Sequence, residues 1–177
     1  MKKIMVIGVS AGVGKSTFAK KLGEALNINV YHLDALYWKP GWVEAAAEEF
    51  EAAQRAIINR DQWIIEGNYS GTFDIRFDRA DTIFYLELPL YVCLYRVFKR
   101  WLMNIGKTRP DMGEGCKEKL DWPFLKFICT TYYPRKKKMA ERLQAFQTPD
   151  SQKTVFILKS KQEIQSNLDH FVKEAVY

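Results

Sequence analysis

Short apolar runs alternate along this chain with segments of helical periodicity. The first run, residues 4–7, leads through a glycine-bearing loop into a segment with apolar side chains at helical spacing up to Leu26. Four later runs are short, apolar and rich in β-branched or aromatic residues, which is typical of buried strands. They cover residues 29–33, 63–65, 82–86 and 154–158. Alternating strands and helices predict an α/β fold with a parallel sheet covered on both faces.

The segments between these runs predict helices. Residues 43–59 carry acidic side chains early, basic ones late and a single apolar face. Pro89 opens a strongly amphipathic helix, and the last helix begins with a capping box formed by Ser160 and Glu163. Two further helical pieces are expected at residues 124–131 and 135–146.

Residues 104–122 break the periodicity. This stretch combines four glycine or proline residues with many charges. It is longer than an ordinary connection in a compact domain, and loops of that length are usually functional. We therefore expect a mobile flap there.

Composition places few further limits on the function. At 177 residues, 47% of them apolar, one globular domain is expected. No apolar run is long enough to span a membrane, and the first strand begins at once, so a cytoplasmic protein is expected. The net charge of +6 suits binding of polyphosphate and also permits binding of nucleic acid. The spacing of Cys93, Cys116 and Cys129 indicates neither a disulfide framework nor a zinc site.

The loop after the first strand has the composition of a phosphate-binding loop. Between a strand and a helix, its backbone N–H groups and the positive end of the helix dipole attract phosphate. We expect Lys15 to reach the β- and γ-phosphates of ATP and Ser16 to bind Mg²⁺. The nucleotide contacts are then expected from Ser10, Ala11, Gly12, Val13, Gly14, Lys15, Ser16 and Thr17.

This loop departs from the pattern G-x-x-x-x-G-K-[ST] at one position. Counting back from Gly14 places the first glycine of the pattern at Val9, whereas Gly8 comes one residue earlier. We interpret the loop as longer by one residue, which leaves the geometry at Val9 and Ser10 open. Gly12 and Gly14 still stand where the backbone must approach phosphate.

Acidic residues follow two of the predicted strands. Asp34 ends the second strand, where it could order the Mg²⁺ shell or accept the proton of an acceptor hydroxyl; the plain alternative is a turn or cap residue. Glu66 ends the third strand at a Walker-B-like position. With Gly67 and Asn68, it is expected to contact the acceptor.

Several other side chains have both a functional and an ordinary interpretation. Arg109 in the flap could reach the γ-phosphate or be a solvated charge. The basic run 135–138 is typical of a solvated face, although it could grip phosphate or a nucleic-acid backbone. His32 is expected to be an ordinary strand-end residue, and Trp38 and Trp42 to pack rather than to stack on a ligand.

Several motifs together resemble one known family. They are the phosphate loop with HLDALYWKPGW, WIIEGNY, DTIFYLELP, YRVFKRW and KTRPDMGEG. The whole chain resembles the bacterial DNA topology modulation protein family, P-loop kinase-like proteins similar in layout to adenylate and shikimate kinases. The resemblance implies a three-layer α/β/α P-loop NTPase domain over residues 1–177, with strand order 2-3-1-4-5. It also implies an acceptor-binding helical part at 34–60 and a small helical lid, the flap at 104–122.

The resemblance also suggests roles for residues after the fourth strand. Arg96 and Arg100, which share a helix face, fall where such kinases carry lid arginines, Arg96 against the adenine ring and Arg100 on phosphates. The turn at residues 159–161 would hold adenine through its backbone.

Three functions agree with the sequence. The first is a kinase that uses Mg-ATP and a small-molecule or nucleotide acceptor, with Lys15, Asp34, Arg100 and Arg109 as catalytic residues and Ser16 and Asp34 on the metal. The second is an ATPase or nucleotide-binding regulator without a dedicated acceptor. The third is a DNA-associated protein switched by nucleotide, although the sequence carries no DNA-binding motif.

Overall fold

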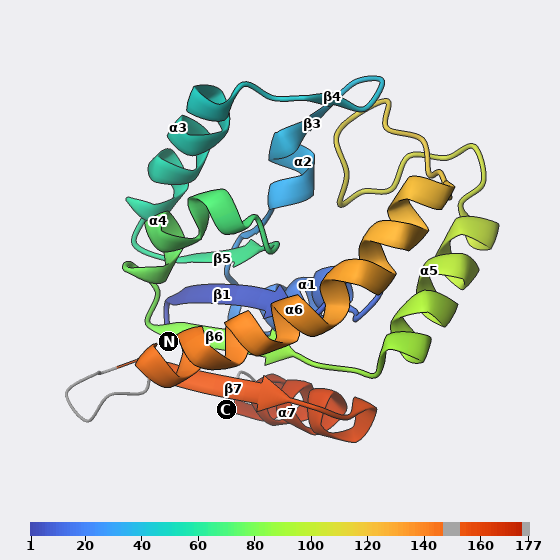
Figure 1. Ribbon diagram of the computed structural model, residues 1–177. Helices are drawn as coiled ribbons and strands as arrows, with labels where there is room; N and C mark the ends of the chain where they lie inside the picture. The colour runs from blue at the N-terminus through green and yellow to red at the C-terminus, as the bar shows by residue number, and fades with distance from the viewer. Residues whose placement is uncertain (147–152, 175–177) are drawn as a thin grey trace.

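Five parallel strands form the centre of the molecule in the computed structural model, which describes residues 1–146 and 153–174 (Figure 1). They are β1 (Lys3–Gly8), β2 (Val30–His32), β5 (Trp63–Glu66), β6 (Thr82–Leu86) and β7 (Thr154–Leu158). The sheet order is β2-β5-β1-β6-β7. Counted among these five strands alone, this is the expected order 2-3-1-4-5.

Both faces of the sheet are covered by helices. Successive residues of β1 from Ile4 to Ile7 are fully buried, which explains why the strands are continuous apolar runs. On one face, the ring of Phe84 in β6 lies 5.0 Å from Phe18 of α1 (Lys15–Leu26). It lies 5.7 Å from Phe171 of α7 (Lys161–Glu174). The two helices therefore share that face.

The long helix α6 (Trp122–Phe146) crosses the other face (Figure 1). The hydroxyl of Tyr132 donates a hydrogen bond to the carbonyl of Leu88 at 2.8 Å, and the Phe146 ring packs 4.4 Å from Phe77. The sequence predicted two helical pieces here, and this was wrong. Pro134 removes a backbone donor, but α6 continues through it because both halves are fixed against the core.

Short elements fill the segments around the sheet. The helices are α2 (Leu33–Tyr37), α3 (Ala47–Ile58), α4 (Phe73–Phe77) and α5 (Leu90–Met103), with a 3₁₀ turn η1 (Ser70–Thr72). Strands β3 (Trp38–Lys39) and β4 (Val43–Glu44) form an antiparallel hairpin. Residues 43 and 44 thus belong to a strand, so the helix predicted from 43 begins at Ala47. In the described ranges, no helix is long and apolar enough to cross a bilayer.

The loop after α5 contains no helix at residues 104–121, so the expected lid is not helical. It lies against the β3–β4 hairpin (Figure 1). A Cβ atom on Gly113 would lie only 1.7 Å from the carbonyl oxygen of Trp38, so the two backbones touch. The Cys116 thiol donates to the carbonyl of Lys39 at 3.2 Å. The indole of Trp42 donates to the carbonyl of Lys117 at 3.0 Å. These contacts bring the loop over the carboxyl ends of the strands.

Candidate active site

The phosphate loop between β1 and α1 is packed so closely that glycine is needed at several positions. Gly12 and Gly14 adopt left-handed φ values of 77° and 107°. A Cβ on Gly12 would lie 2.3 Å from the carbonyl oxygen of Cys93 in α5. At Gly12 the loop therefore rests directly on α5, which leaves no room for a side chain there.

The extra residue in this loop is accommodated at its start. Gly8 takes the close approach, because a Cβ there would lie 2.5 Å from Cγ1 of Val13. Val9 is buried, and its N–H donates to the carbonyl of Leu86 at 2.9 Å, so Val9 continues the pairing of β1 with β6 beyond the end of the strand. Ser10 is also buried and lines neither of the cavities described next. The predicted nucleotide contact from Ser10 is therefore not placed at the cavity.

Two cavities open beside the phosphate loop. The first has a volume of about 910 Å³ and is lined by the loop, α1, α5 and α7. The second, of about 780 Å³, is lined by α2, α3, the hairpin and α6. Four residues line both cavities: Lys15, Ser16, Arg100 and Arg109. The two spaces thus meet at the residues whose charges and hydroxyl group suit a phosphate group.

The first cavity contains most of the predicted nucleotide contacts. It is lined by residues 12–17, whereas Ala11 lines the second cavity. Arg96 also lines the first cavity, and its Nη1 donates a hydrogen bond to the carbonyl of Val13 at 2.8 Å. Of the turn at 159–161, Lys161 lines the cavity, while the N–H of Lys159 is taken by Glu163 at 2.7 Å.

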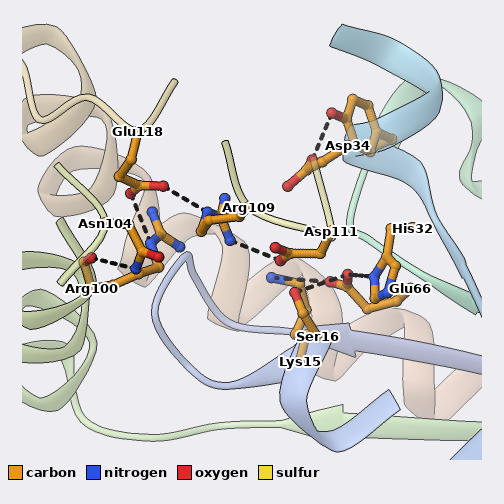
Figure 2. Close-up of polar contacts among 11 residues, drawn as sticks. Lys15, Ser16, His32, Asp34, Glu66, Arg100, Asn104, Arg109, Asp111 and Glu118 are labelled. Carbon is orange, nitrogen blue, oxygen red and sulfur yellow. Dashed lines mark hydrogen bonds and ion pairs between the residues drawn. The ribbon is translucent and has the colours of Figure 1, made fainter. Parts of the chain in front are cut away.

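Glu66 stands at the centre of the polar contacts around the loop (Figure 2). Its carboxylate is buried and accepts a hydrogen bond from Ser16 Oγ at 3.1 Å. It lies 3.8 Å from Lys15 Nζ and 2.9 Å from Nδ1 of His32. Burial acts to lower the pKa of His32. The hydrogen bond with Glu66 and the charge of Glu66 outweigh this effect and raise the pKa above 6.5. The interpretation of His32 as an ordinary strand-end residue missed this contact.

The flap loop contributes two carboxylates that bind arginines (Figure 2). Arg109 donates from Nε to Glu118 at 2.6 Å and from Nη1 to Asp111 at 2.7 Å. The other oxygen of Glu118 accepts from Nε of Arg100 at 2.9 Å. Burial opposes ionisation of Asp111, but the charge of Arg109 holds the pKa of Asp111 below its ordinary value. Neither carboxylate was identified from the sequence.

Asp34 lies in the first turn of α2 and lines the second cavity. It accepts a hydrogen bond from the Tyr69 hydroxyl at 2.7 Å. Burial and the nearby charge of Glu66 raise the pKa of Asp34 above its ordinary value. Of the two roles considered for Asp34, this position favours contact with an acceptor, because Glu66 is the carboxylate that binds Ser16.

Gly67 and Asn68 line the second cavity but are also tied to the sheet. The Asn68 amide accepts from the N–H of Gly8 at 3.0 Å and donates to its carbonyl at 2.8 Å. Behind them, the fully buried Arg76 donates to the carbonyl of Asn68 at 3.1 Å, and burial lowers the pKa of Arg76 to about 10. Sequence reasoning missed Arg76 because a lone arginine in a short polar segment has the pattern of a surface residue.

The residues present fit a magnesium ion that arrives with a nucleotide. In the described ranges, no group of three or more His, Cys, Asp or Glu side chains could hold a metal ion by itself. Mg²⁺ commonly takes only one or two protein oxygens and completes its shell with phosphates and water. Ser16 donates its hydroxyl proton to Glu66, so the oxygen lone pairs of Ser16 remain available for such an ion.

Comparisons with known proteins identify the fold. No protein-family model matches the chain, and a search of curated proteins finds no match. Among solved structures, a shikimate kinase from Acinetobacter baumannii in complex with shikimate is similar, with a TM-score of 0.52 and 13% sequence identity. The match covers 100% of this chain and 96% of the shikimate kinase chain. A gluconokinase from Sinorhizobium meliloti 1021 has a TM-score of 0.51 at 14% identity, covering 99% and 95%.

A further similar structure is a putative kinase from Chloroflexus aurantiacus, with a TM-score of 0.53 at 12% identity over 100% of both chains. At such identities the likeness is one of fold. It confirms the predicted α/β fold of P-loop kinases. The resemblance to topology modulation proteins receives no support from these comparisons.

Proposed function

We propose that this chain, which has the fold of the P-loop kinases, transfers the γ-phosphoryl group of ATP to a hydroxyl group of a small acceptor. The observation that carries the proposal is the meeting of two cavities at Lys15, Ser16, Arg100 and Arg109. Transfer requires a donor and an acceptor on opposite sides of one phosphoryl group. The first cavity would hold ATP and the second the acceptor.

On the donor side, the chain supplies binding groups. The N–H groups of the phosphate loop and the N-terminus of α1 bind phosphate oxygens, and Lys15 adds an ammonium group. Bound Mg²⁺ would neutralise phosphate charge and would be held by Ser16, whose hydroxyl Glu66 orients.

At the junction, two arginines stabilise the transferred group. Glu118 binds Arg100 and Arg109 through their Nε atoms. The terminal nitrogens of Arg100 make no hydrogen bond to Glu118. Positioned donors of this kind stabilise charge in the transition state without reorganising. The two hydrogen bonds to Glu118 hold both guanidinium groups in place.

On the acceptor side, Asp34 would accept the proton of the attacking hydroxyl. Burial raises its pKa, which makes this carboxylate a stronger base than an exposed one. The Tyr69 hydroxyl donates a hydrogen bond to Oδ1 of Asp34 at 2.7 Å. Loss of a general base typically costs about 10²- to 10⁴-fold in rate.

The size and lining of the second cavity favour transfer over hydrolysis. Water needs no cavity of about 780 Å³ lined by seven aromatic side chains, among them Tyr37, Trp38 and Trp42. This volume lies within the range of small-molecule sites. An ATPase without a dedicated acceptor would leave this space unexplained.

The proposal is tested by ADP formation from Mg-ATP with and without candidate acceptors. We expect one acceptor class to raise the rate well above that in water alone. Asp34→Asn should reduce the stimulated rate at least about 100-fold. Asp61→Asn, at an exposed position, serves as the matched control and should leave it unchanged. Equal ADP formation with and without every acceptor tested would favour the ATPase instead.

A further inference from the structure

The cations that line the second cavity differ in how they are compensated. Four of them pair with carboxylates of this chain, at 2.6 to 3.8 Å: Lys15 with Glu66, Arg100 and Arg109 with Glu118, and Lys119 with Asp121. The fifth is Arg135 of α6. In the part of the chain that the structure describes, no carboxylate pairs with it.

Arg135 is nevertheless partly withdrawn from water. It is half-buried, and its guanidinium carbon lies 4.5 Å from the centre of the Phe127 ring. Burial lowers the pKa of Arg135. A guanidinium group that stacks on an aromatic ring keeps its N–H donors free around its edge. The side chain therefore combines a fixed position with unused donors.

The acids that line the same cavity are already engaged. Asp34 accepts from Tyr69, and Glu51 lies 3.7 Å from Arg55. The remaining three carboxylates are those that pair with the other cations. The cavity thus contains a positive charge that no side chain lining it compensates, and a desolvated charge without a partner is costly.

The rest of the wall indicates what the anion is attached to. Seven aromatic side chains line the cavity, from α2, the hairpin, α3, the segment after β5 and α6: Tyr37, Trp38, Trp42, Phe50, Tyr69, Phe124 and Phe127. Flat aromatic surfaces pack well against a ring or another compact apolar scaffold. Lys15, Ser16, Arg100 and Arg109 lie at the junction with the first cavity, where the reacting hydroxyl would stand.

We infer that the acceptor is an anionic ring compound, whose carboxylate or phosphate group binds Arg135 while its hydroxyl group faces Asp34. The inference rests on the proposed function, because it treats the second cavity as the acceptor site. Carboxylate and phosphate share the chemistry that a guanidinium fork recognises. The choice between them is left to the arms of the experiment.

The test uses paired probes that differ only in the anion. One arm compares nucleoside 5′-monophosphates with the matching nucleosides, and the other compares hydroxylated ring carboxylic acids with their methyl esters. Calorimetry measures binding with and without a nonhydrolysable ATP analogue. The variant is Arg135→Gln. Its matched control is Arg142→Gln, which removes an arginine of the same helix that stacks 4.4 Å from the Phe73 ring and lines neither cavity.

We expect the charged member of at least one pair to bind about tenfold or more tightly than its neutral partner. Arg135→Gln should abolish that difference, and Arg142→Gln should keep it. Equal binding within every pair, binding of no anionic probe at millimolar concentration, or an unchanged preference in Arg135→Gln would overturn the inference. Preferential binding without ADP formation would support the anion site and count against the proposed transfer.

Discussion

Arg109 of the flap loop is held by Glu118 of the same loop, with 2.6 Å between Nε and the carboxylate oxygen. The same carboxylate binds Arg100 of α5 at 2.9 Å, and its side chain is almost completely buried. One acidic residue therefore fixes two arginines that line both cavities. Its own carboxylate is occupied by these contacts, so we regard Glu118 as a positioning residue.

Glu118→Gln tests this role. The amide keeps the shape but offers one acceptor instead of two and turns an N–H group toward an arginine, so the arginines lose their fixed position. We expect kcat for acceptor-dependent ADP formation to fall by about 10- to 100-fold, with a smaller change in KM for ATP. The matched control is Glu114→Gln, at an exposed position of the same loop. An unchanged kcat in Glu118→Gln would exclude the role.

The contact between Gly113 and the hairpin is expected to hold the flap loop in its place over the site. In Gly113→Ala, the added Cβ would lie 1.7 Å from the carbonyl oxygen of Trp38, so the loop must move away from the hairpin. We expect faster tryptic cleavage after the exposed Lys107 and Lys117 and at least a tenfold loss of turnover. Glu114→Ala provides the control, because Glu114 is exposed in the same loop and lines neither cavity. Cleavage at the wild-type rate would show that this contact does not seat the loop.

The pair of His32 and Glu66 predicts a pH dependence of stability. The pKa of His32 is raised above 6.5 in the folded chain, so the folded state holds this proton more tightly than the unfolded state. The stabilisation is fully present below about pH 6.5 and is lost as pH rises through the higher folded pKa. A typical hydrogen bond contributes roughly 1 kcal/mol, or about 2–4 °C in Tm for a chain of this size, and a bond between charged groups contributes at least as much.

Thermal unfolding between pH 5.5 and 8.5 measures this effect. We expect His32→Gln to lose part of the decline in Tm that the wild type shows toward high pH. Gln162→Asn, at an exposed position of α7, should retain the whole decline. Parallel Tm curves for wild type and His32→Gln would refute the coupling.

The sheet and the phosphate loop could be predicted because their signals are local. The runs at 82–86 and 154–158 coincide with β6 and β7. Every residue of β6 is buried, which is why this strand is a nearly continuous apolar run. The glycines before Lys15 identified the phosphate loop, although only the structure shows Gly8 taking the close approach. Lys15, Ser16 and Arg109 were singled out from their positions relative to predicted elements, and Arg100 through the family resemblance. The structure brings all four to the junction of the cavities.

The contacts that complete the site could not be predicted, because they join residues that are far apart in the sequence or lie in irregular segments. Asn68 binds Gly8 across a separation of 60 residues, so its amide is committed to the sheet. Asp111 and Glu118 belong to a loop without periodicity, where charged residues have the pattern of a solvated segment. Asp34 was placed at a strand end, but the chain already turns into α2 at Leu33.

The central claim is that the loop from Gly8 to Thr17 binds the phosphates of ATP, and calorimetric titration with Mg-ATP tests it most directly. The wild type is expected to show saturable binding at submillimolar concentration. Lys15→Ala should weaken it at least tenfold with Tm unchanged, whereas Lys138→Ala, at an exposed position of α6, should bind as the wild type does. Absence of saturable heat in the wild type at millimolar Mg-ATP, or equal affinity in Lys15→Ala, would contradict the account.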